Sequence, residues 1–206
     1  IRVLGSLSLI LMVVLSCTAC GADLEKVIRQ ANSVSKVTTL APATEKELVM
    51  ELAGNITSHA LLDLSITGTF KAVVGYDNDA GRKLKRIAAG SPDDCRAMGE
   101  SIVSGNQMNA IRSVFLYPGE FQSASGMISN GLYIRIRINS EAGEPLLLMI
   151  PYTKPPSGLS FGKPRFQESG ALTEEEQKQM LTAFNRGIES FPEGAAIWSE
   201  HKDDTL

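Results

Sequence analysis

The stretch Leu132-Tyr133-Ile134-Arg135-Ile136-Arg137-Ile138 decides the fold. Isoleucine and arginine alternate along it. Because successive side chains of a strand point to opposite faces, the stretch predicts a half-buried strand with its isoleucines inward and its arginines outward. A turn-rich run over residues 139–144 and a largely apolar return over 145–152 come next. Together the three segments predict a hairpin of an antiparallel sheet.

Segments on either side are expected to extend this sheet. Apolar and polar residues alternate over residues 64–74, and the pair Pro155-Pro156 precedes another strand-like segment over 159–166. Gly68 falls on the inward face of the first segment, which indicates a bulge or a close approach of another backbone segment. The sequence therefore predicts about four strands in one antiparallel sheet.

Helical segments surround the strands along the chain. Thr44 and Thr173 are each followed three residues later by a glutamate, the pattern of a capping box at a helix start. Ser91-Pro92 is a third start signal, with a serine cap and a proline in the first turn. Helices are expected over residues 44–58, 82–90, 92–104, 106–115 and 173–190. The fold class is thus α+β, with four or five helices covering the sheet.

The N-terminal part of the chain carries a targeting signal. Residues 3–15 form an uncharged apolar run after Arg2, and the run ends in Val14-Leu15-Ser16-Cys17-Thr18-Ala19-Cys20. It is shorter than the ~20 residues of a membrane-spanning helix and matches the apolar core of an export signal. Its end resembles the lipobox of bacterial lipoprotein precursors, in which a cysteine becomes the lipidated first residue of the mature protein. The resemblance implies a lipid on Cys17, with Cys20 as the alternative. An ordinary secretory signal cut near Gly21 or Ala22 also fits.

This N-terminal signal determines the organisation and the location that we expect for the protein. The expected parts are a signal peptide over residues 1–16, a lipid anchor and tether over 17–42, a single globular domain over 43–191, and a tail over 192–206. Trp198 in the tail is expected to dock back onto the domain. The expected location is the cell envelope, on the periplasmic side of a bacterial membrane, with the protein attached through its N-terminal lipid.

The pairing state expected for Cys95 depends on which N-terminal cysteine carries the lipid. Export places the chain where disulfides persist. If Cys17 carries the lipid, Cys20 and Cys95 are available for a disulfide. If Cys20 carries it, Cys95 is left as a buried thiol.

Composition and motifs argue against several kinds of function. A net charge of −3 with 6% aromatic residues is not the balance of a nucleic-acid-binding protein. The only histidines are His59 and His201, so neither a metal site nor any cofactor is expected. The segment Gly158-Leu159-Ser160-Phe161-Gly162 matches the Gly-x-Ser-x-Gly pattern of many serine hydrolases. It is interpreted as a turn that enters a strand, and no catalytic residue is assigned.

Two functional interpretations follow. The first is a non-catalytic binding or assembly module that works with an envelope protein partner. The alternative is an envelope hydrolase that uses a serine with His59. The most specific surface feature is basic: Arg135 and Arg137 share one face of a strand, and Lys163 and Arg165 are expected to join them if the next strand pairs nearby. Such a cluster can bind a carboxylate, a phosphate or a glycan anion, although outward arginines of a sheet are also commonly just solvated.

Overall fold

The predicted hairpin lies at the centre of the sheet. In this computed structural model, which describes residues 42–122, 126, 128–141, 145–154, 157–168, 172–203 and 205–206, it is formed by β4 (Ile128–Ile138) and β5 (Leu146–Thr153). Ile134 and Ile136 are buried, whereas Arg135 and Arg137 are only half-buried. The predicted alternation along this strand is therefore confirmed.

Seven antiparallel strands form the sheet, not about four. Their order is β2-β1-β3-β4-β5-β6, and β7 pairs with β5. The remaining elements are α3 (Glu45–Thr67), β1 (Val73–Asn78), β2 (Gly81–Arg86), α4 (Pro92–Ser104), β3 (Arg112–Gln122), β6 (Ser160–Phe161), β7 (Arg165–Glu168), α5 (Glu174–Glu189) and α6 (Pro192–His201). The described residues thus contain four helices, and the α+β class is confirmed.

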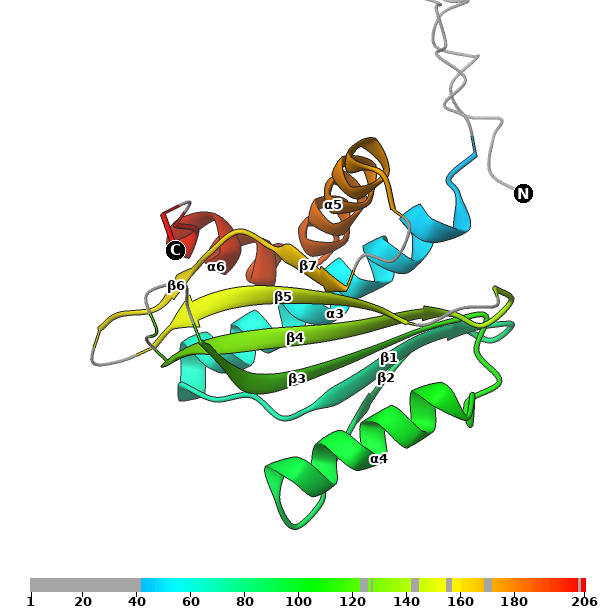
Figure 1. Ribbon diagram of the computed structural model, residues 1–206, viewed down its shortest axis with the longest axis horizontal. Helices are drawn as coiled ribbons and strands as arrows, with labels where there is room; N and C mark the ends of the chain where they lie inside the picture. The colour runs from blue at the N-terminus through cyan, green and yellow to red at the C-terminus, as the bar shows by residue number, and fades with distance from the viewer. Residues whose placement is uncertain are drawn as a thin grey trace, which may run out of the picture. The chain divides into compact units, whose positions relative to one another are not determined.

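Helices lie on both faces of the sheet (Figure 1). α3 packs on one face with α5 and α6 beside it, whereas α4 packs on the opposite face over β1 and β3. Each face has its own apolar core. The larger core, on the α3 side, includes Leu52, Ile56, Val114, Ile134 and Phe184. The smaller core, on the α4 side, consists of Ala72, Val74, Ile87, Ile102, Val103, Phe115 and Tyr117.

The prediction of a strand over residues 64–74 is wrong for the first half of that range. α3 continues to Thr67, because Leu61 and Leu64 keep its buried face in contact with the core. Gly68 is the helix C-cap, with a left-handed φ of 70° that suits glycine, and not a strand bulge. The strand that follows, β1, begins only at Val73.

Two predicted short helices are strands. Residues 81–86 form β2, which pairs with β1 across a turn at Asp79-Ala80. β2 is an edge strand rich in lysine and arginine, a composition that discourages pairing with other chains. The helix predicted over 106–115 is replaced by β3, whose residues Val114 to Tyr117 are buried from both sides by the two cores. A strand that is buried on both faces shows no alternation from which it could be recognised.

The helix starts predicted at Thr44, Ser91 and Thr173 are confirmed. The hydroxyl of Thr44 accepts the Glu47 backbone N–H at 3.2 Å, and the Glu47 carboxylate accepts the Thr44 backbone N–H at 2.8 Å. Thr173 and Glu176 form the second capping box, and Ser91 caps α4. The segment expected as a tail contains a helix, α6, and Trp198 in it docks against Phe161 with ring centroids 5.9 Å apart. The predicted signal peptide, Cys17 and Cys20 lie outside the described residues.

Candidate functional site

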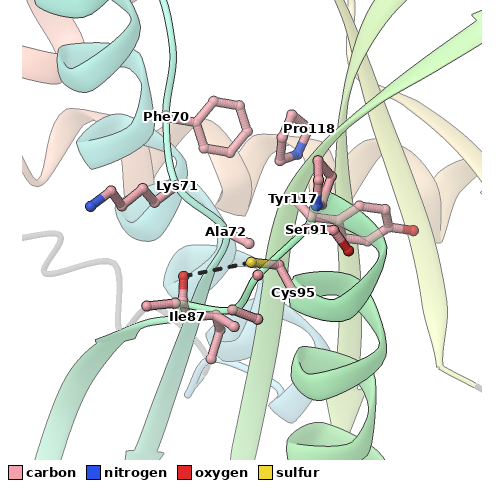
Figure 2. A pocket seen from close by; sticks show the side chains of 12 residues that line it. Phe70, Lys71, Ala72, Ile87, Ser91, Cys95, Tyr117 and Pro118 are labelled. Carbon is pink, nitrogen blue, oxygen red and sulfur yellow. Dashed lines mark hydrogen bonds between the residues drawn. The ribbon is translucent and has the colours of Figure 1, made fainter.

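A pocket of about 340 Å³ lies where α4 begins. It is beside the open end of the β1–β2 hairpin, where β1 starts and β2 ends. Figure 2 shows the pocket between the first turn of α4 and the neighbouring strands. Its walls come from four separate segments of the chain. The lining residues are Phe70, Lys71, Ala72, Ile87, Ala88, Ala89, Gly90, Ser91, Pro92, Cys95, Tyr117 and Pro118.

The pocket forms because the sheet narrows at this point. The backbone N–H of Ile87 donates to the Ala72 carbonyl at 2.8 Å, just beyond the paired residues of β1 and β2. β3 continues past this level, but its residues after Leu116 pair only with β4. The chain segments 69–72 and 87–91 therefore stand apart from β3, and the space between them is the pocket.

α4 closes one side of the pocket at a fixed position. Ser91 caps the helix by accepting the Asp94 backbone N–H at 3.1 Å. About two turns further on, Gly99 lies directly against the ring of Phe115, where an added Cβ would overlap the ring atoms. This close contact seats the helix on β3, so that Cys95 faces the pocket (Figure 2).

The pocket offers apolar surface and no free charge. The amino group of Lys71 points away from the other lining side chains (Figure 2), and the Ser91 hydroxyl donates to the Asp94 carboxylate at 2.8 Å. The Cys95 thiol points at the Ile87 carbonyl, 4.0 Å away. Burial raises the pKa of Tyr117, so this phenol stays neutral at physiological pH. These contacts suit an uncharged, mainly hydrocarbon ligand.

Tyr117 links the pocket to the interior of the sheet. Its ring stacks on Phe115, with centroids 4.9 Å apart, and on Tyr133, with centroids 5.5 Å apart. The Tyr133 hydroxyl donates to the Glu120 carbonyl at 3.0 Å, which fixes the end of this aromatic row. The inner wall of the pocket is therefore rigid, whereas the outer wall is the exposed loop over residues 88–90.

His59 lies on α3, away from the pocket. Its ring stacks on Phe191 with centroids 4.2 Å apart, and no serine hydroxyl bonds to it among the described residues. Burial, followed by the positive charge of Arg86, lowers the pKa of His59. The described part of the chain also holds no group of three or more histidine, cysteine or acidic side chains placed to bind a metal ion. The surroundings of His59 thus give the hydrolase alternative no support.

The four predicted anion-binding residues fall into two groups. Arg135 and Arg137 lie two residues apart on β4, on the α4 side of the sheet. Arg165 is on β7, with β5 in between, and its guanidinium donates to the Leu206 carbonyl at 2.6 Å. Lys163 is exposed in the segment between β6 and β7. Arg165 of β7 pairs with Met149 of β5. On its other side, Met149 lies opposite Tyr133 of β4, and not opposite an arginine of that strand.

Most pocket residues were missed from the sequence. Cys95 was singled out from the sequence for its thiol, and it faces the pocket. Phe70, Ile87 and Tyr117 gave no signal, because only the pairing of distant strands brings them together. The predicted pairing of Cys95 with Cys20 stays a prediction.

Comparison of the chain with protein-family models, with curated proteins and with solved structures found no match. No helix in the described ranges combines the length and the apolar character needed to cross a bilayer. The interpretation of this protein therefore rests on its own residues.

Proposed function

We propose that the protein is a lipid-anchored, non-catalytic binding module of the bacterial cell envelope that holds a small uncharged apolar molecule beside Cys95. The observation that carries the binding role is the pocket at the start of α4. The apolar run and the two cysteines of residues 3–20 support the proposed envelope location and the proposed lipid anchor. An envelope protein that delivers the ligand or receives it is the proposed partner.

The size and the lining of the pocket support this class of ligand. A volume of about 340 Å³ falls within the range of ligand pockets, roughly 300–1,000 Å³. Removing apolar ligand surface from water contributes about 25 cal/mol per Å². An ionised ligand would lose its hydration without gaining a counter-charge in the pocket.

The binding role can be tested with 1-N-phenylnaphthylamine, a neutral apolar fluorophore whose emission rises when it leaves water. The wild-type protein should bind it, and Cys95→Phe should abolish binding by filling the pocket. Met98→Phe is the matched control, because it adds a ring to the same helix at an exposed position outside the pocket lining. Circular dichroism checks that both variants are folded. Binding that is equal in Cys95→Phe and wild type, or absent from the wild type, contradicts the proposal.

The anchor needs a separate measurement. Intact mass spectrometry of the mature protein, extracted from membranes, should give a polypeptide that begins at Cys17 and carries acyl chains. A lipidated start at Cys20 supports the alternative register. A start at Ala22 without lipid contradicts the anchor but leaves the pocket's role untouched.

A further inference from the structure

Three arginines gather beside α4, on the part of the sheet that this helix leaves open. Arg135 and Arg137 project from β4, and Arg96 comes from α4. The carboxylate of Glu100 lies 3.7 Å from a terminal nitrogen of Arg135 and 3.8 Å from Nε of Arg96. Arg96, Arg135 and Arg137 are called the arginine cluster below.

The arginine cluster carries more positive charge than its surroundings compensate. Arg96 and Arg135 share the one carboxylate of Glu100, and Arg137 has no hydrogen bond or ion pair within the described residues. Asp77, the buried acid of β1, is bound to Arg82 and Arg112 on the α3 side. Three cations therefore face one anion, which leaves two positive charges without a partner.

Burial adds a second argument. The Nε atoms of Arg135 and Arg137 are both shielded from solvent and have no hydrogen-bond partner. An unsatisfied buried donor costs about 1–3 kcal/mol. The stems of both side chains are packed on the sheet, so a ligand would fix little additional side-chain motion.

We infer that the arginine cluster is a binding site for a phosphate group. A tetrahedral oxyanion with about two negative charges matches the two uncompensated cations, and guanidinium forks bind such oxygens in pairs. The phosphate can belong to a free anion or to the headgroup of an anionic lipid. The site lies beside the apolar pocket, because Arg135, Arg96 and Glu100 all act on Tyr117, which lines the pocket. The inference does not depend on the proposed function.

Calorimetric titration with inorganic phosphate at low salt tests the site. The full chain should carry Cys17→Ser and Cys20→Ser, so that no attached lipid contributes. Arg137→Met should weaken phosphate binding at least about tenfold, because it removes an unpaired cation but keeps an apolar stem. Arg96→Met, at an exposed helix position, should weaken it too. Lys83→Met is the control, since Lys83 lies on the edge strand β2 and loses the same charge.

A second arm distinguishes the two sources of phosphate. Co-sedimentation with phosphatidylglycerol vesicles is compared with co-sedimentation with phosphatidylcholine vesicles for the same variants. Binding to phosphatidylglycerol alone that is lost in Arg137→Met but kept in Lys83→Met assigns the site to a lipid headgroup. Calorimetric binding without vesicle binding assigns it to a free anion. If neither probe distinguishes Arg137→Met from Lys83→Met, the inference is overturned.

Discussion

Gly99 of α4 lies directly against the ring of Phe115 on β3, and no side chain larger than hydrogen fits between them. Phe115 is fully buried in the smaller core, where its ring also stacks on Tyr117. This one contact determines how close α4 comes to the sheet. It thereby sets the position of Cys95 and the depth of the pocket.

Gly99→Ala should therefore destabilise the protein, although alanine is the better helix former by about 1 kcal/mol. Overpacking of a filled core costs about 1–3 kcal/mol, which should exceed the gain in helix propensity. Urea unfolding measures the difference. Ser101→Ala, on the exposed side of the same helix, should be close to neutral. A Gly99→Ala protein more stable than wild type would contradict this packing.

A similar close approach joins α3 to α5. A Cβ added at Gly54 would overlap the carbonyl oxygen of Phe184, and one added at Gly187 would overlap that of Glu51. Around this crossing, Arg186 donates from Nε to the Glu51 carboxylate at 2.8 Å. Both Gly54→Ala and Gly187→Ala should lower the free energy of unfolding, by about 1–3 kcal/mol each, because the helix backbones must separate. Chemical denaturation of both variants checks this, and a neutral result for both would contradict the close crossing.

Glu176 should contribute to acid sensitivity. Hydrogen bonds from Lys46, from the Thr173 backbone N–H and from the Thr173 hydroxyl lower its pKa from 4.5 to about 2. Because the pKa is depressed in the folded state, the stabilisation is present above pH 4.5 and is lost as the pH falls towards about 2. Glu176→Gln should flatten the loss of stability between these pH values. Glu174→Gln, in the same first turn of α5, is the control and should keep the wild-type slope.

His59 should give a second, separate pH dependence. Its pKa lies below the ordinary value of 6.5, mainly because of burial and then because of Arg86. The unfolded chain therefore binds a proton more readily, and stability should fall as the pH drops below 6.5. His59→Phe, which keeps an aromatic ring against Phe191, should reduce this loss between about pH 7 and pH 5. Thermal unfolding at the two pH values measures it, with His201→Gln as the control.

The features predicted correctly from the sequence depend on neighbouring residues. The capping boxes at Thr44 and Thr173 need only a glutamate three residues away, and the alternation around Arg135 needs only one exposed face. β2 and β3 were missed because their strand state depends on pairing with β1, which brings together residues as distant as Val73 and Leu116.

The same reason applies to the candidate sites. Arg135 and Arg137 could be identified as neighbours from the sequence alone, whereas Arg96 joins them only because α4 packs beside this part of the sheet. Phe70 and Tyr117 face one pocket only because the sheet narrows between them. Long-range pairing is the information that local periodicity does not contain.

Trp198 gives a direct test of the C-terminal segment, because it is the only tryptophan in the chain. It is 8% exposed and packs on Phe161, which is fully buried. Its emission should therefore be blue-shifted in the native protein and move to longer wavelength on unfolding. Trp198→Ala should cost about 3–5 kcal/mol of stability, and Trp198→Phe clearly less, because it retains a ring against Phe161. If residues 192–206 were a frayed tail, the emission would be that of a solvated indole and both variants would unfold like the wild type.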